Sequence, residues 1–267
     1  MTECEQQGGA PELEIDGAVA TLRLCRPDQA NRIEPGDLAV LIGHFRSLRE
    51  RHAQVRSLLI TAGGKHFSSG FHLGAIVSGL EAGASFREAG SSDAFAEMVD
   101  ALEALPQITV CAINGGVFGG ATDLALACDF RLGEPATRMR MPAARFGLHY
   151  YATGLRRYLA RLGLNASKRL FLMADELNAD ALLEIGFLTS IVPAERLQAE
   201  AKEIACQAST MAPLACAGMK SALNAMAAGR YDPVEGERIY QACMVSADIR
   251  EGIAAALAKR APCFEGR

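Results

Sequence analysis

Asn114-Gly-Gly-Val-Phe-Gly-Gly-Ala-Thr-Asp-Leu-Ala-Leu-Ala-Cys-Asp129 is the stretch that decides the fold of this 267-residue chain. The run before it, Ile108-Thr-Val-Cys-Ala-Ile113, is apolar and rich in β-branched residues, which predicts a buried strand. After the glycines, Ala121–Cys128 has the composition of a short buried helix. A strand that leads through a glycine turn into a helix leaves unpaired N–H groups at the N-terminal, positive end of the helix dipole. A ligand oxygen can approach the backbone closely there, because glycine has no side chain. This stretch alone allows two interpretations. The turn binds a ligand oxygen, or its glycines merely permit close packing between the strand and the helix.

The composition is that of an ordinary soluble globular protein. Half of the residues are hydrophobic and 22% are charged, which is enough for a sizeable core. A net charge of -4 does not indicate a protein that binds nucleic acid, because such proteins are typically basic. We expect no membrane span, because no apolar run is long enough, and no signal peptide. The eight cysteines show no CxxC motif or regular pairing, so we expect reduced thiols in a cytoplasmic protein.

The N-terminal part predicts two units in which strands lead through a turn into a helix. Leu13–Leu24 alternates around an Asp-Gly pair, which predicts a β-hairpin, and an amphipathic helix begins at Pro35. A strand at 54–61 leads through glycines into Phe67–Leu73 and a short helix. Residues 81–92 are rich in glycine, alanine and serine, which predicts a mobile loop.

The C-terminal part alternates short strands with helices and then becomes entirely helical. We expect strands near 130–133, 137–141 and 188–192, and helices at 154–162, 166–174 and 179–185. From Ala194 onward the pattern is helical, with breaks near Met211–Pro213 and Gly229. The expected organisation is a flexible leader at 1–11, a core at 12–195, and a C-terminal helical region at 196–267 within the same functional unit.

Several short pieces, in order over about residues 12–267, resemble the crotonase (enoyl-CoA hydratase/isomerase) superfamily. They are Arg26-Pro27 with Asn31, Phe67–Gly70, Asn114-Gly115, Gly119-Gly120 before an acidic residue, Cys128-Asp129, Phe187-Leu188 with Val192, and Lys259-Arg260 to Phe264. The resemblance implies an α/β fold, a crotonase-like spiral of repeated ββα units with a C-terminal helical layer. It also implies an acyl-CoA thioester substrate, with coenzyme A as part of the substrate and no separate cofactor or metal, and a homotrimer or dimer of trimers.

The resemblance also implies which residues bind the thioester. The backbone N–H groups of Phe71 and Gly120 correspond to an oxyanion hole, which stabilises the enolate that forms on the thioester. The residues that correspond to the family's coenzyme A contacts are Ala30, Asn31, Arg32, Ser68 and Ser69. Lys259 or Arg260 is expected to reach the phosphates of coenzyme A from a neighbouring subunit.

The acid and base groups depart from the pattern of the family's hydratases, which use two glutamates. Asp123 keeps the first carboxylate, shortened by one methylene, and Ala143 replaces the second glutamate. His149, Tyr150 and Tyr151 follow that position, in a loop expected to face the acyl pocket. His149 and Tyr150 are the candidate catalytic residues, and packing of the loop as an aromatic cluster is the other interpretation. We interpret the arginines at 156, 157 and 161 as a solvated helix face.

Three functional hypotheses follow. The first is a hydratase- or isomerase-like enzyme of acyl-CoA and fatty acid metabolism, with Asp123 as the acid/base group. The second is a CoA-ester decarboxylase or other lyase, because the family's methylmalonyl-CoA decarboxylases also lack the second glutamate and have a tyrosine at the place of Tyr150. The third is an acyl-CoA-binding protein without catalytic activity. The sequence leaves the acyl group open.

Overall fold

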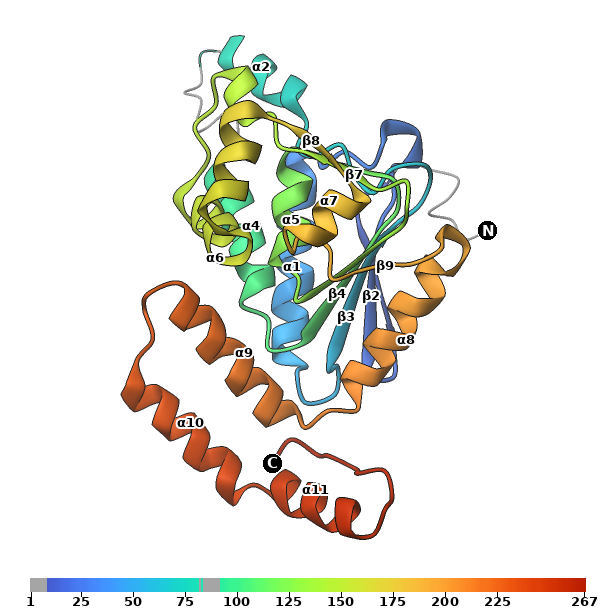
Figure 1. Ribbon diagram of the computed structural model, residues 1–267, viewed down its shortest axis with the longest axis vertical. Helices are drawn as coiled ribbons and strands as arrows, with labels where there is room; N and C mark the ends of the chain where they lie inside the picture. Colours follow the sequence, from blue (N-terminus) through green and yellow to red (C-terminus); the bar gives the residue numbers. More distant parts are fainter. Residues whose placement is uncertain (1–8, 82, 84–91) are drawn as a thin grey trace.

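The computed structural model describes residues 9–81, 83 and 92–267, and the centre of this part of the chain is a six-stranded sheet (Figure 1). Its order is β1-β2-β3-β4-β6-β9. The β1 strand is antiparallel to β2, and the other neighbours are parallel. The strands are β1 (Glu12–Asp16), β2 (Val19–Leu24), β3 (Ser57–Ala62), β4 (Ile108–Ile113), β6 (Phe130–Gly133) and β9 (Ser190–Ile191). A smaller sheet has the order β5-β7-β8 and consists of β5 (Gly116–Phe118), β7 (Arg138–Arg140) and β8 (Glu176–Asn178).

Helices cover both faces of the large sheet, which explains why every residue of β3 is buried. On one face, Leu58 and Ile60 of β3 belong to the main core, together with residues of α1 (Pro35–Glu50), α4 (Ser92–Glu103) and α5 (Gly120–Ala127). On the other face, Leu59 belongs to a smaller apolar cluster with α8 (Leu197–Ser209). The alternation of β3 therefore decides which helix layer each side chain meets.

The last three helices extend away from this core (Figure 1). They are α9 (Pro213–Ala227), α10 (Pro233–Val245) and α11 (Ala247–Leu257). Of the described residues, those in α9 and α10 are all at least partly exposed. Lys220 ties α9 to the core, because its ammonium group donates to Asp129 Oδ2 at 2.7 Å and to the Gln107 carbonyl at 2.8 Å.

The predicted fold class is confirmed, and most predicted elements are present. The hairpin, the helix that begins at Pro35 and the strand at 108–113 have the predicted places, and so do α2 (Leu73–Glu81) and α7 (Ala179–Glu184). The helices expected at 154–162 and 166–174 form α6 (Ala152–Lys168), which is interrupted by the positive φ of Gly163, followed by a π-helical turn at Arg169–Met173. The β5 and β8 strands were not predicted: β5 lies within the glycine-rich stretch that was interpreted as a turn, and β8 lies between two segments that were interpreted as helices. Most of the loop predicted at 81–92 and most of the leader predicted at 1–11 lie outside the described residues.

The cysteines correct one expectation. In the described part of the chain, the free cysteines are Cys111, Cys128, Cys206, Cys216, Cys243 and Cys263. Cys25 is disulfide-bonded, so the expectation of reduced thiols throughout was wrong, because sequence spacing does not reveal which cysteines a fold brings together. None of the helices in the described ranges is both long and apolar enough to cross a bilayer.

Candidate active site

A cavity of about 660 Å³ contains most of the predicted catalytic region. Its wall is largely aromatic and aliphatic, with Phe71, Leu73, Phe95, Phe118, Met141, Phe146 and Leu148. A hollow of about 870 Å³ between α9, α10 and the core is lined by many charged residues instead and by none of the predicted site residues. In the described ranges, no group of histidine, cysteine and acidic side chains could hold a metal ion.

Two turns meet at the cavity, one after β3 and one before α5. Gly70 has a φ of +89°, and a Cβ atom there would lie 2.5 Å from the Phe118 carbonyl oxygen and 3.0 Å from Gly120 N. Only glycine allows this approach. In the described part of the chain, the backbone N–H groups of Phe71 and Gly120 form no hydrogen bond, and both residues line the cavity. The structure therefore brings together the two amides that the family resemblance implies.

The loop at residues 30–31 supports the first of these turns. Ala30 and Asn31 both have a positive φ, at 49° and 48°. The Asn31 side chain donates to the carbonyl groups of Gly63 and His66 at 2.7 and 2.9 Å, so this buried amide is engaged within the protein. Asparagine suits such a position, because it tolerates the left-handed region better than most residues.

The other predicted coenzyme A contacts cluster at the same loop, with one exception. Ser68 Oγ donates to the Asn31 carbonyl at 2.7 Å, and the Ser69 N–H donates to the Ala30 carbonyl at 2.7 Å. Arg32 follows directly and pairs with Glu34. Lys259 comes after α11, which lies at the opposite end of the molecule from α2 (Figure 1). A single chain does not bring Lys259 to the other predicted contacts.

Asp123 lies behind the cavity wall rather than in it. This fully buried residue of α5 is not among the described residues that line the cavity. Its Oδ1 accepts a hydrogen bond from Arg157 Nη1 at 2.7 Å, and its Oδ2 accepts from the hydroxyl groups of Tyr151 and, at 3.3 Å, Tyr150. A Cβ atom on Gly154 would lie 2.8 Å from Oδ2, so α6 also packs closely against the carboxylate.

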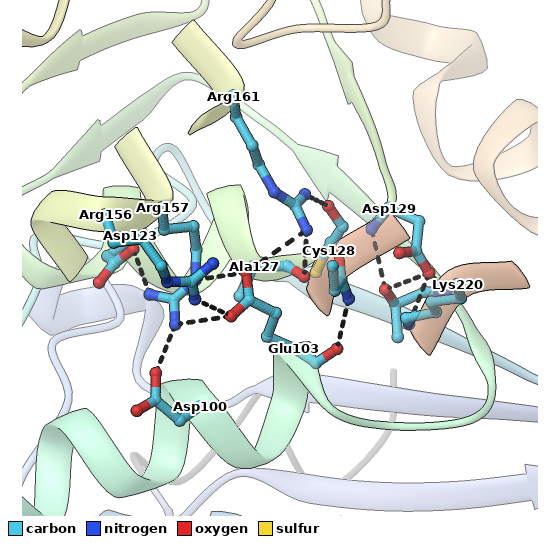
Figure 2. A network of polar contacts seen from close by, with 12 residues as sticks. Asp100, Glu103, Asp123, Ala127, Cys128, Asp129, Arg156, Arg157, Arg161 and Lys220 are labelled. Carbon is cyan, nitrogen blue, oxygen red and sulfur yellow. Dashed lines mark hydrogen bonds and ion pairs between the residues drawn. The ribbon is translucent and has the colours of Figure 1, made fainter. Parts of the chain in front are cut away.

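Arg157 of α6 connects Asp123 to an ion-pair network (Figure 2). Its side chain is 0% exposed and also pairs with Asp100 at 2.6 Å and with Glu103 at 3.1 Å. Burial alone would lower the pKa of Arg157, but the charges of Asp123 and Glu103 outweigh burial and raise it. Arg156 and Arg161 contact Glu103 as well. The interpretation of these arginines as a solvated helix face was wrong, because α4 presents acidic side chains to them.

Residues 149–151 precede α6 and line the cavity. The Tyr150 ring packs on Phe171 of the core, with centroids 5.3 Å apart, whereas the Tyr151 ring packs on Phe95 of the cavity wall at 6.2 Å. Burial and the negative charge of Asp123 raise the pKa of both tyrosines, so both hydroxyl groups are protonated at neutral pH. His149 is exposed, and Ala143, in the cavity wall, is 4% exposed.

Arg157 was not predicted as part of the site, and Tyr151 was named only as a member of the loop for which catalysis and aromatic packing both stayed open. A signal for the network was available in α4. Phe95, Val99 and Glu103 follow one another at intervals of four residues, which places Glu103 on the inward side of that helix. A carboxylate on an apolar helix face requires a buried cation. Nothing in the pattern says which arginine supplies it.

Comparisons with known proteins identify the family of the chain. The family model described as enoyl-CoA hydratase/isomerase matches residues 14–267, and the chain belongs to that family. It is 29% identical to the probable enoyl-CoA hydratase echA6 of Mycobacterium tuberculosis, over 93% of this chain and 96% of that protein. It is also 29% identical to the carnitinyl-CoA dehydratase of Salmonella typhi, over 94% and 97% of the two chains. The structure of an enoyl-CoA hydratase from Bacillus anthracis is similar, with a TM-score of 0.86 and 26% identity, over 97% of this chain and 100% of that chain.

We expect Asp123→Ala to lower the free energy of unfolding by about 3 kcal/mol, because it removes one partner from a buried ion pair. Urea denaturation measures the change. The control is Asp175→Ala, which removes the partner of Arg169 from a largely exposed pair and should cost less than about 1 kcal/mol. Equal losses in the two variants would contradict a stabilising role for the Asp123–Arg157 pair.

Gly70→Ala should cost about 1–3 kcal/mol more than Gly17→Ala in the same measurement, because the new Cβ overpacks the turn before α5. Gly17 is a matched control, since it has a φ of +57° but a Cβ atom there would have no neighbour within 4 Å. Equal losses would mean that Gly70 is needed only for its backbone conformation.

Proposed function

We propose that this protein is an enzyme that binds an acyl-CoA thioester and stabilises its enolate with the N–H groups of Phe71 and Gly120. The observation that carries the proposal is the close approach of the two turns, which places two residues whose N–H groups make no hydrogen bond within the described chain in the wall of one apolar cavity. A thioester oxygen that accepts from both amides becomes more negative as the enolate forms. Donors of this kind are worth about 3 kcal/mol each in the transition state. Membership of the enoyl-CoA hydratase/isomerase family supports the same chemistry.

The leading reaction is isomerisation or slow hydration, with Asp123 as the carboxylate of the site. Relatives of this chain are named as a hydratase and a dehydratase. Efficient hydration with two carboxylates does not fit the site, because Ala143 stands in the cavity wall where the second glutamate is expected. The apolar lining favours an apolar acyl group.

Decarboxylation of a CoA ester is the second candidate. The observation that favours it is that both oxygens of Asp123 are already engaged by Arg157 and Tyr151. Loss of carbon dioxide leaves its electron pair on the enolate, so this reaction needs the oxyanion hole but no base to create the charge. Tyr150 and His149, which line the cavity, are then the groups that assist.

The assembly that we propose is a homotrimer or a dimer of trimers in the cytoplasm. Apolar side chains on α9–α11 are exposed, and contact with a second copy would bury them: Met219, Leu223, Met226, Val234, Tyr240, Val245, Ile253 and Leu257. The backbone near Ala30, Arg32 and Ser69 is proposed to hold coenzyme A. Lys259 of a neighbouring copy would complete that site.

We expect the wild-type protein to have a mass of three or six times 28.4 kDa in size-exclusion chromatography with light scattering. Leu223→Glu should shift it toward monomer, because it places a charge on an apolar contact surface. The control Leu172→Glu makes the same change at a leucine that is equally exposed (67% against 66%) but lies outside the C-terminal helices. A monomeric wild-type protein would contradict the proposed assembly.

The function is tested by following crotonyl-CoA at the absorbance of its enoyl thioester. We expect slow hydration by the wild type, its loss in Asp123→Asn, and a gain of at least about 10-fold in Ala143→Glu, because the new carboxylate can activate water. Ala143→Gln is the control for size. If Asp123→Asn keeps the wild-type rate, Asp123 is not the acid/base group.

The alternatives are separated by further thioesters. Turnover of a malonyl-type thioester without hydration of crotonyl-CoA would favour the decarboxylase. Binding of both thioesters in calorimetry without any turnover would contradict the proposed enzyme and favour a silent acyl-CoA-binding protein.

A further inference from the structure

Asp123 has no open path to a ligand in the cavity. Its carboxylate is fully buried, Arg157 occupies Oδ1, and two tyrosine hydroxyl groups occupy Oδ2. Any proton that moves between Asp123 and a bound thioester therefore has to pass through a group that contacts both Asp123 and the cavity. Tyr150 and Tyr151 meet these two conditions, since both line the cavity.

We infer that Tyr151 is the catalytic residue that exchanges a proton with the acyl-CoA substrate, and that Asp123 is a positioning residue that acts through it. The inference rests on the proposed function, because it assumes that a thioester enolate forms in this cavity. It gives the proton-transfer role to a residue that the sequence places in the loop at 149–151 without choosing it as a catalytic residue.

The packing of the two rings favours Tyr151 over Tyr150. The Tyr151 ring contacts Phe95, and the Phe95 ring lies 5.8 Å from that of Phe71, whose N–H belongs to the proposed oxyanion hole. Tyr151 thus continues the aromatic wall that leads to the reacting thioester. Tyr150 is 8% exposed, and its ring faces Phe171 in the core.

The proton transfer balances without any further reactant. The thioester gives its α-proton to Tyr151 Oη, while the electron pair of the C–H bond moves into the enolate. At the same time, the hydroxyl proton of Tyr151 passes to Asp123 Oδ2, with which it already shares a hydrogen bond. Return of the proton by the same route to another carbon completes an isomerisation, and its return to the α-carbon exchanges the hydrogen.

Arg157 and the buried setting explain why the tyrosine remains neutral throughout. Arg157 holds Oδ1 at 2.7 Å, which leaves Oδ2 oriented toward the hydroxyl groups. Burial and the charge of Asp123 raise the pKa of Tyr151, so its phenolate does not accumulate. We therefore expect an exchange rate that does not rise between about pH 7 and about pH 9, as it would if a tyrosinate of lowered pKa were the base.

The test measures exchange of the α-hydrogen for deuterium in phenylacetyl-CoA and hexanoyl-CoA by mass spectrometry in D₂O. Tyr151→Phe removes one hydroxyl group and keeps the ring packing. It should lower the exchange rate at saturation by about 100-fold or more, with the dissociation constant of the thioester within about 3-fold of the wild type. The control is Tyr158→Phe, which removes a buried hydroxyl group that bonds Thr122 rather than Asp123 and should exchange at nearly the wild-type rate.

A double-mutant cycle tests the positioning role of Asp123. Asp123→Asn should slow exchange about as much as Tyr151→Phe, and the double variant should be no slower than either, because the two residues act as one unit. Additive losses would overturn the inference. So would a Tyr151→Phe rate equal to that of Tyr158→Phe, or a larger loss in Tyr150→Phe. A wild-type protein that binds both thioesters but exchanges neither would overturn the proposed function together with this inference.

Discussion

The buried guanidinium group of Arg157 is the constraint on which the geometry of the site depends. Moving a charge of this size out of water costs several kcal/mol, and only well-placed partners offset that cost. The partners are Asp100 and Glu103 of α4 and Asp123 of α5, while Arg157 belongs to α6 (Figure 2). The three helices are therefore held in one relative arrangement. A shift of any one of them would leave a buried charge without its partner.

The N-terminal ends of these same helices form the cavity. Phe95 is in the first turn of α4, Gly120 begins α5, and Tyr151 directly precedes α6. The ion-pair network lies about one or two helical turns further along each element, so it fixes the directions in which the three ends point. This separation explains how the cavity wall can be largely apolar while the residues that support it are charged. The charged side chains lie behind the wall, where hydrogen bonds and ion pairs offset the free-energy cost of burying them.

The sequence predicted the elements of the fold better than the contacts between them. The hairpin was predictable from the alternation of its strands around an Asp-Gly pair, and β4 from a continuous apolar run rich in β-branched residues. The pairing of Phe71 with Gly120 followed from a resemblance, and its physical cause, the close approach of Gly70, is visible only in three dimensions. Arg157 was misread because helical periodicity gives the face of a residue but not the helix that the face meets. Strand β5 was missed because its glycine was interpreted as part of a turn, and β8 because its single apolar residue lies between two predicted helices.

The shortened carboxylate and the adjacent tyrosine are best understood together. A glutamate at position 123 would carry its carboxylate about 1.5 Å further from the backbone than aspartate does. The Tyr151 hydroxyl group bonds Asp123 Oδ2, and Tyr151 also lines the cavity. In the proposed mechanism, Tyr151 supplies at the cavity wall the polar group that the shortened carboxylate does not provide there. The proposed oxyanion hole would consist of backbone amides at glycine turns, so such an exchange of side chains would leave it unaffected. A fold of this kind can keep its means of stabilising an enolate while the groups that move protons change.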